Sequence, residues 1–231
     1  MRRTTPGVSA VGGWAARAEA HDQEKVIRAL EPLVTELRRQ RLREVIGRRL
    51  VSVGVALDAP YDPHNGAAVL RSCEAFGVQR LHVVERKGTP FAVAHTVARG
   101  AEKWIDVRRH PEPWSFLDWA SQSKTTLVAA HPDGELPPEE LAAMPRVAIV
   151  LGNERDGIRH ELAAACLTRV RVPMRGFVES LNMSVTAAIL LYAATRGRTG
   201  DLAPAAQRRL YARGLYLSVA HAENILVAAG I

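Results

Sequence analysis

The chain has 231 residues, of which 47% are apolar, and it carries 31 lysines and arginines against 24 acidic residues. A chain of this kind can form one medium α/β domain with helical extensions, or two small domains. The apolar run over residues 185–194 is too short to cross a bilayer, and the first 21 residues contain no hydrophobic segment typical of a secretory signal. We therefore expect a cytoplasmic protein without a membrane partner.

The positive charge favours a polyanionic partner. The formal net charge is +7 and the sequence pI is about 10, although an arginine-rich proteome would give the same composition. The arginines gather in two clusters around a more neutral middle, a pattern that favours an RNA-binding surface over two solvated helix faces. The first cluster contains Arg38, Arg39, Arg41, Arg43, Arg48 and Arg49, and the second contains Arg196, Arg198, Arg208, Arg209 and Arg213.

The spacing of apolar and helix-breaking residues predicts helices that alternate with strands. In chain order we expect a helix over 23–47 that Pro32 can split, a strand over 51–57, a helix over 65–77, strands over 80–85 and 103–107, a helix over 113–123, strands over 125–130, 146–151 and 169–172, and helices over 183–196 and 204–229. This order predicts a parallel sheet with helices on both faces.

Three loops are expected to leave the carboxyl ends of these strands, where the ligands of such sheets bind. The first contains His64 and Asn65, and Arg71 follows on the next helix. Taken alone, Asn65 would be a helix cap and Arg71 a surface residue paired with Glu74. A structural role is also the simplest interpretation of His64 and of His131, which follows a later strand, although His64 is the better candidate for a substrate contact.

The second loop places Gly152 and Gly157 around Asn153 and Glu154. Such a segment is often a plain turn, but its glycines can also let the backbone approach a ligand while Glu154 holds a polar group. It lacks the Gly-Lys-Ser/Thr ending of a phosphate loop, and the sequence contains no Rossmann fingerprint.

The third loop, residues 172–184, joins a proline, a glycine and a Ser-Leu-Asn triplet to the apolar run that follows. Proline fixes the backbone and glycine frees it, so the loop has a defined path. Ser180 or Asn182 is a suitable N-cap for the following helix. A loop of this kind can hold a small cofactor with its backbone groups. The two cysteines, Cys73 and Cys166, have no metal-ligand neighbours, so we expect buried thiols and no metal.

The order of these three segments resembles the three signature motifs of the SpoU/TrmH family of SPOUT RNA methyltransferases. The residues that carry the resemblance are Asn65, Arg71 and Glu74-Ala75-Phe76-Gly77, then Leu151-Gly152-Asn153-Glu154 with Gly157, then Val172-Pro173-Met174 with Ser180-Leu181-Asn182-Met183-Ser184. The segments Lys103-Trp104, Arg208 to Gly214 and Ala222-Glu223-Asn224 look like the TrmH branch, which methylates tRNA. Gly66, Glu179 and Met183 depart from the usual pattern, and Gly66 could alter the mobility of the helix that carries Arg71.

The resemblance implies a SPOUT fold with a deep C-terminal trefoil knot, an exception to the rule that chains are unknotted. It implies a homodimer that binds S-adenosylmethionine in the knot and tRNA across the dimer. The corresponding division of the chain is a flexible tail over 1–22, a basic helical extension over 23–49, the methyltransferase domain over 50–198 and a C-terminal helical extension over 199–231.

The resemblance also implies roles for individual residues. Arg71 matches the family's essential arginine and would act on the ribose hydroxyl with the help of a neighbouring phosphate. Asn65 would orient Arg71 or the ribose, while Glu154, Ser180 and Asn182 would shape the catalytic site. The cofactor would be held by Ala130, Gly152, Val172, Met174 and Leu181, and the RNA by His64 and by Arg38, Arg39, Arg41, Arg43, Arg196, Arg198, Arg208, Arg209 and Arg213.

The expected reaction is 2′-O-methylation of a ribose in tRNA, at guanosine 18 of the D-loop. The nearest alternative is a ribosomal RNA methyltransferase of the same family, although the absence of a separate N-terminal RNA-binding domain favours tRNA. A catalytically silent RNA-binding protein with this fold is a second alternative, against which the intact motif residues argue. A general nucleotide-binding α/β protein would need a phosphate loop, which the sequence lacks.

Overall fold

The computed structural model describes residues 8–10, 18–86 and 91–231. The chain forms two compact units. The first contains residues 51–198 together with the strand at residues 8–10, and the second contains the described residues from 18 to 50 and residues 199–231. Most of the tail expected over residues 1–22 lies outside the described residues. Within it, β1 (Val8–Ala10) pairs antiparallel with β4 (Ala92–Ala94), so this short part of the expected tail is a strand.

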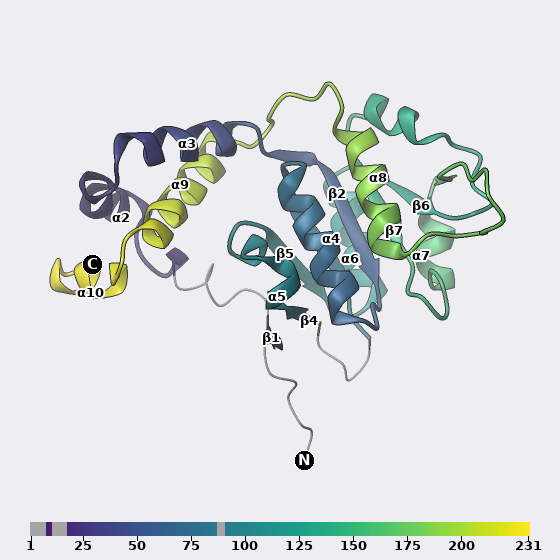
Figure 1. Ribbon diagram of the computed structural model, residues 1–231, viewed down its shortest axis with the longest axis horizontal. Coiled ribbons are helices and arrows are strands. Elements are labelled where there is room, and N and C mark those ends of the chain that lie inside the picture. The colour runs from purple at the N-terminus through teal and green to yellow at the C-terminus, as the bar shows by residue number, and fades with distance from the viewer. Residues whose placement is uncertain (1–7, 11–17, 87–90) are drawn as a thin grey trace, which may run out of the picture. The chain divides into compact units, whose positions relative to one another are not determined.

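The first unit is built on a parallel sheet with the strand order β5-β3-β2-β7-β6-β8 (Figure 1). Its strands are β2 (Leu50–Asp58), β3 (Val78–Val84), β5 (Asp106–His110), β6 (Thr126–Ala130), β7 (Val147–Leu151) and β8 (Thr168–Val170). The six strands expected from the sequence are therefore confirmed. The strand expected over 103–107 begins at Asp106, because Ala101–Lys103 forms a 3-10 turn.

Helices cover both faces of the sheet, which confirms the expected α/β architecture. Figure 1 shows α4 (Pro63–Ala75) and α8 (Met183–Thr195) in front of the sheet and α6 (Pro113–Gln122) and α7 (His160–Ala165) behind it. All five residues of β7 are buried, as expected for a central parallel strand covered on both sides. The remaining short elements of this unit are α5 (His95–Ala98) and the 3-10 turn Pro138–Ala143.

A buried ion pair fixes the end of β2 to the segment that follows β7. The Asp58 side chain is fully buried, and it accepts hydrogen bonds of 2.6 Å from both the backbone N–H and the Nε of Arg159. Because β2 and β7 are neighbours in the sheet, this pair holds their outgoing loops in register. A buried charge of this kind is stable only while its partner stays in place.

Two histidines are packed inside the sheet's rear layer. His82 Nδ1 and His110 Nε2 lie 2.9 Å apart, and the His82 ring lies against Phe116 and Trp119 of α6. Burial lowers the pKa of His82 to about 2, with a further contribution from His110, and burial also lowers the pKa of His110. Both imidazoles are therefore neutral at pH 7, so one donates its N–H to the other.

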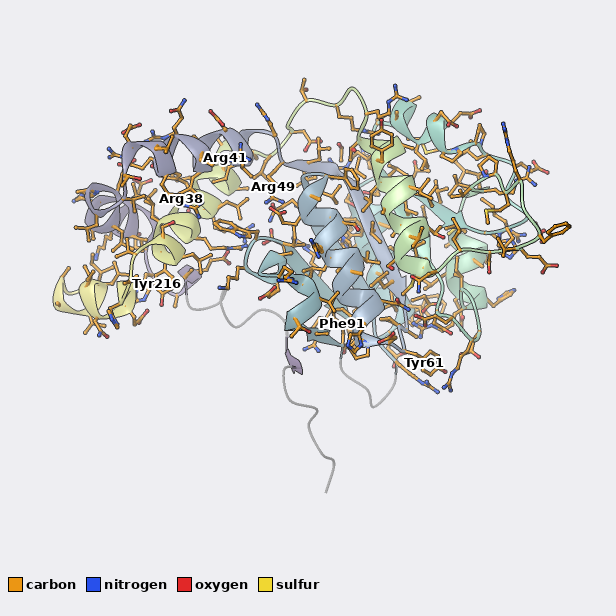
Figure 2. The ribbon with its side chains drawn as sticks, viewed as in Figure 1. Arg38, Arg41, Arg49, Tyr61, Phe91 and Tyr216 are labelled. Carbon is orange, nitrogen blue, oxygen red and sulfur yellow. The ribbon has the colours of Figure 1, made fainter. Side chains whose placement is uncertain are left out.

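Gly66 allows an aromatic ring to pack directly on α4. A Cβ atom at this position would lie 2.6 Å from Cε2 of Phe91, whose side chain is buried (Figure 2). The Phe91 backbone is anchored on both sides, because its N–H donates to Glu85 and its carbonyl accepts from Arg109. The departure from the family pattern at Gly66 is thus matched by a ring that occupies the space a larger side chain would need.

The described part of the second unit is helical, and four helices with defined bounds lie within it. They are α2 (Gln23–Leu30), α3 (Glu36–Gly47), α9 (Pro204–Ser218) and α10 (Ala222–Ala228), and α2 and α3 are joined by the 3-10 turn Glu31–Leu33. The expected split at Pro32 is confirmed. The single helix expected over 204–229 is wrong, because Val219 is extended and His221 adopts a left-handed conformation with φ 55°, which ends α9 and starts α10.

We predict that Gly66→Ala changes the free energy of unfolding in opposite directions in the presence and in the absence of the Phe91 ring. In the wild-type background, Gly66→Ala should lower the free energy of unfolding, since the new methyl group must displace the Phe91 ring. In a Phe91→Ala background the same change should raise it by up to about 1 kcal/mol, because alanine favours a helix over glycine. Urea unfolding of the four proteins measures both effects. Equal effects in the two backgrounds would show that the ring does not constrain this position.

Candidate active site

The three loops singled out in the sequence meet at the carboxyl ends of the strands. The second and third loops line a pocket with a volume of about 480 Å³ at the carboxyl ends of β6, β7 and β8, and the first loop is joined to both of them through Asn65. The strand order reverses direction between β2 and β7, so the loops leaving these two strands diverge and leave an opening, as at the ligand sites of other open α/β sheets. The pocket is lined by residues 130–132, 151–154, 157–158, 170–172, 174, 179–183 and 186.

A chain of hydrogen bonds joins the three loops. Asn65 donates from Nδ2 to Glu154 Oε1 at 2.5 Å, and its own Oδ1 accepts from Asn182 Nδ2 at 3.1 Å. The Asn182 Oδ1 in turn accepts from the backbone N–H and the hydroxyl of Ser184. One side chain from each loop therefore contributes to a single polar chain, in which each amide group has a defined orientation.

Local structure explains why these side chains are available. Asn182 is the N-cap of α8, so its position is set by the start of a strongly apolar helix. Asn65 lies in the first turn of α4, which Asp62 caps and Pro63 begins. The expectation that Asn65 itself caps the helix is wrong by three residues, and this frees the Asn65 side chain to reach Glu154.

The loop after β7 is held in its turn by Asn153. Its buried side chain accepts hydrogen bonds from the backbone N–H groups of Arg155 and Asp156, and its backbone pairs with Gly157. A Cβ atom at Gly152 would lie 2.3 Å from the carbonyl carbon of Gly157, so the turn closes only with glycine there. Asn153 was not among the residues predicted for catalysis or cofactor binding, although an asparagine between two glycines is a recognisable turn signal.

The pocket collects most of the residues proposed for the cofactor and for catalysis. All five proposed cofactor residues, Ala130, Gly152, Val172, Met174 and Leu181, line it. Of the proposed catalytic residues, Glu154, Ser180 and Asn182 line it as well, and Asn65 is bonded to two of its walls. His131, Ile158 and Thr186 also line the pocket without having been proposed.

Comparison with known protein families identifies the family of the chain. The model of the SpoU rRNA Methylase family matches residues 52–192, which is more than half of the chain. The chain belongs to the SpoU methylase family. The matched region begins in β2, ends in α8, and contains every residue of the hydrogen-bonded chain described above.

Individual relatives within the SpoU family resemble the chain over most of its length. The tRNA (guanosine(18)-2'-O)-methyltransferase of Thermus thermophilus is 35% identical over 71% of this chain and 84% of its own length. The protein of the same name from Escherichia coli is 30% identical over 68% of this chain and 69% of its own. The 23S rRNA (guanosine-2'-O-)-methyltransferase RlmB of Coxiella burnetii is 35% identical, but over 62% of this chain and 57% of its own.

Solved structures of SpoU enzymes share the fold. The A. aeolicus TrmH/SpoU tRNA modifying enzyme superposes with a TM-score of 0.71 at 27% identity, covering 80% of this chain and 98% of that one. The AdoMet-bound rRNA methyltransferase from Sinorhizobium meliloti superposes with a TM-score of 0.57 at 28% identity, covering 67% of this chain and 59% of that one.

Arg71, the arginine to which the resemblance gave a catalytic role, does not line the pocket of its own chain. It lies six residues after Asn65 on α4, which places it about 9 Å further along the helix and about 120° around it. The side chain is exposed, and none of the described residues pairs with it. The structure therefore does not bring Arg71 to Asn65 within one chain.

Most of the arginines proposed to bind RNA already interact with other side chains of the second unit. Arg39 pairs with Glu36, Arg41 with Glu44, Arg43 with Glu31 and Glu36, Arg208 with Glu24, Arg209 with Glu19, and Arg38 donates to the Ser218 hydroxyl. Glu31, a partner of Arg43, also accepts a hydrogen bond from the hydroxyl of Tyr211. The pKa of this hydroxyl is raised to about 12 by burial and by Glu31. Exposed pairs of this kind are weak, so a phosphate can still replace the carboxylate.

Two of the proposed RNA contacts are contradicted by the structure. Arg213 is 1% exposed and binds Glu19, so its charge is used inside the helical unit. Arg198 donates to the carbonyls of Leu141, Met144 and Ala194 and to the Ser52 hydroxyl, which ties the end of α8 to the sheet. Sequence clustering missed both, because their partners lie far away in the chain.

The remaining residues proposed to contact RNA, Arg196 and His64, are exposed to solvent. The guanidinium carbon of Arg196 lies 5.9 Å from the ring centroid of Tyr192, while the exposed His64 ring contacts Asp62 at 3.0 Å.

Of the two cysteines, Cys73 is buried and Cys166 is partly buried, and burial raises the pKa of the Cys166 thiol to about 11. The residues that the structure describes contain no group of three metal-ligating side chains and no helix long and apolar enough to cross a membrane.

Two substitutions separate the two hydrogen-bonding roles of Asn182. Asn182→Ala removes the N-cap of α8 and should lower the free energy of unfolding by about 1 kcal/mol. Asn182→Asp keeps the capping oxygen and adds a negative charge at a helix N-terminus, so it should stay within about 0.5 kcal/mol of the wild type. Urea unfolding gives both values. An equal loss in the two variants would mean that the bond to Asn65, which both remove, matters more than the cap.

Proposed function

We propose that this chain methylates a ribose 2′-hydroxyl of tRNA with S-adenosylmethionine, and that its target is guanosine 18. The observation that carries the proposal is the hydrogen-bonded chain of Asn65, Glu154 and Asn182 at the mouth of the pocket. It joins the three segments that define the SpoU family at the point where a cofactor and a ribose must meet. The relatives that are named as tRNA (guanosine(18)-2'-O)-methyltransferases support tRNA as the substrate.

The pocket suits S-adenosylmethionine in size and chemistry. Its volume of about 480 Å³ falls in the usual range for small-molecule sites, and both apolar side chains and polar groups line it. Gly152 lines the pocket together with Val172, Met174, Leu181 and Ala130. The cofactor, when bound, supplies an electrophilic methyl group on a sulfonium centre.

We infer that the pocket lies within a C-terminal trefoil knot of the type found in SPOUT enzymes. Residues 134–136 run alongside the end of β8, where the Leu136 N–H donates to the Arg169 carbonyl and the Arg171 N–H donates to the Leu136 carbonyl. This parallel pairing lies directly before the loop over residues 172–182 that returns to the pocket. The inference of a knot rests on membership of the SpoU family, whose model matches residues 52–192.

The chain's own residues would prepare the ribose for attack. A 2′-hydroxyl is a weak nucleophile, and transfer requires its oxygen to be held in line with the methyl group. Asn65 is oriented by Glu154 and Asn182, so it can fix the ribose without reorganising. A guanidinium group offers several N–H donors to a phosphate, so Arg71 would bind the adjacent phosphate and polarise the hydroxyl, with the phosphate accepting the proton.

The position of Arg71 indicates that each complete site needs a second copy of the chain. Arg71 lies on a different side of α4 from Asn65, and α4 packs beside α8. On α8, Val185, Ile189 and Tyr192 recur at helical spacing and are exposed, with Leu181 just before the helix. A homodimer formed through this apolar face would cover these side chains and bring Arg71 to the pocket of the partner.

The helical unit would then contribute the tRNA body contacts, as a basic extension of the methyltransferase domain. Five of its arginines can exchange a carboxylate for a phosphate, namely Arg39, Arg41, Arg43, Arg208 and Arg209, and Arg38 can exchange its bond to the Ser218 hydroxyl. The methylation of tRNA would take place in the cytoplasm. Ribosomal RNA is the second candidate substrate, since one relative is named as a 23S rRNA methyltransferase.

Methyl transfer is tested by incubating the protein with S-adenosylmethionine and unmodified tRNA and by mapping the modified ribose. We expect methylation at guanosine 18, and we expect Arg71→Ala to lower turnover by about 100-fold or more while cofactor affinity changes less than about threefold. Methylation of 23S rRNA fragments but not of tRNA would support the second substrate instead. Near-normal turnover of Arg71→Ala would exclude the proposed role of this arginine.

The shared site is tested by mixing two inactive variants. If Arg71 serves the partner's pocket, a heterodimer of Arg71→Ala and Asn65→Ala subunits has one intact site out of two. Random reassortment of equal amounts should then restore about one quarter of the wild-type rate, since half of the dimers are mixed. If each chain used its own Arg71 and Asn65, mixing would restore nothing.

A further inference from the structure

A second cluster of side chains lies next to the hydrogen-bonded chain but outside the pocket. Tyr61, in the loop between β2 and α4, has the guanidinium carbon of Arg86 4.2 Å from its ring centroid and that of Arg155 at 4.6 Å. Its hydroxyl donates to Asp156 Oδ2 at 3.0 Å. Figure 2 labels Tyr61 at the edge of the sheet where these loops emerge.

The cluster is assembled from three adjacent strands. Tyr61 follows β2, Arg86 follows β3 and Arg155 follows β7, and these strands lie side by side in the order β3-β2-β7. Two of the three residues are also close in sequence to the proposed catalytic chain, since Arg155 follows Glu154 and Tyr61 lies four residues before Asn65. The cluster is therefore close to the site, although none of its three residues lines the pocket.

The charges of the cluster are not balanced within the described part of the chain. Neither Arg86 nor Arg155 has a carboxylate within ion-pair distance among the described residues, and both are exposed. Asp156 is bound by the Tyr61 hydroxyl, so two guanidinium groups converge on one ring beside a single carboxylate. The exposed arginines of the helical unit, by contrast, are mostly paired with glutamates.

An anion would relieve this imbalance. Each guanidinium has a planar set of donors that matches a phosphate, and each contact with the ring holds the guanidinium plane in place before the anion arrives. A cation–π contact at an exposed site contributes only about 0.5–1 kcal/mol, which is weak compensation for bringing two like charges together. An RNA backbone offers a phosphate with a base beside it that can stack on an arginine or aromatic plane.

We propose that Tyr61, Arg86 and Arg155 bind a phosphodiester of the RNA next to the methylated nucleotide. This inference rests on the proposed function and specifies which surface receives the RNA strand. The two arginines bind the phosphate, and Tyr61 sets their separation. The site thereby adds affinity for the RNA strand beside Asn65 without contributing to the cofactor pocket or to the chemical step.

The test measures RNA affinity over a series of salt concentrations for the wild type, the double variant Arg86→Ala/Arg155→Ala, and Arg108→Ala. Arg108 is an exposed arginine in the middle of the edge strand β5, so its variant is the matched control for lost charge. The double variant should bind about tenfold more weakly, with a salt slope shallower by roughly 0.7 to 0.9 units, as expected for one lost phosphate contact. Its KM for RNA should rise, while kcat at saturating RNA and the affinity for S-adenosylmethionine should not change.

Tyr61 variants separate binding from local folding. Tyr61→Phe keeps the ring and loses only the bond to Asp156, so its RNA affinity should stay within about twofold of the wild type, whereas Tyr61→Ala should approach the double variant. A fall in thermal stability or in cofactor affinity that accompanies the loss of RNA affinity would overturn the proposal in favour of a purely structural cluster.

The phosphate itself is located by neutralising single phosphodiesters as methylphosphonates within about three nucleotides of the mapped site. One substitution should weaken wild-type binding and have no further effect on the double variant, because the two changes remove the same contact. If the wild type methylates RNA but the double variant behaves like Arg108→Ala, the phosphate site is wrong and the proposed function stands. If the wild type methylates no RNA, the proposed function fails first.

Discussion

The hydrogen bond between Asn65 and Glu154 is the contact on which the arrangement of the site depends. It spans the point where the loops after β2 and β7 turn in opposite directions, a place where an open sheet would otherwise leave a gap. Two features make the bond possible. The buried pair of Asp58 and Arg159 fixes the bases of both loops, and the absence of a side chain at Gly152 lets the second loop close tightly.

Two groups of residues of different character lie close to this bond. One is the lining of the pocket at β6, β7 and β8, which includes Glu154 and Asn182. The other is the cluster of Tyr61, Arg86 and Arg155, which follow β2, β3 and β7 and carry positive charge. Asn65 lies four residues after Tyr61 and is bonded to two residues of the pocket, so the bond fixes the distance between a bound cofactor and a ribose held at Asn65.

Local sequence signals were sufficient for the strands of the sheet, whereas the predicted pocket residues came from the resemblance to the SpoU family. Strand boundaries follow from short apolar runs, and Gly152 and Leu181 lie in the same short loops that the motifs define. The break between α9 and α10 was missed, because no proline or glycine marks it and a left-handed His221 has no sequence signature. The partners of Arg213 and Arg198 were missed for a different reason, since Glu19 and Leu141 are brought to them only by tertiary folding.

Net charge is therefore a poor guide to where this protein meets RNA. The arginine clusters that are most conspicuous in the sequence lie on helices that also carry glutamates, and folding places most of those charges in pairs. Arg86 and Arg155 belong to no cluster in the sequence, yet the sheet brings them to one ring without a carboxylate among the described residues to neutralise them. A paired arginine must give up its carboxylate before it binds a phosphate, whereas an unpaired one does not. The sparse arginines of the catalytic unit should accordingly contribute more per residue to RNA binding than the dense arginines of the helices.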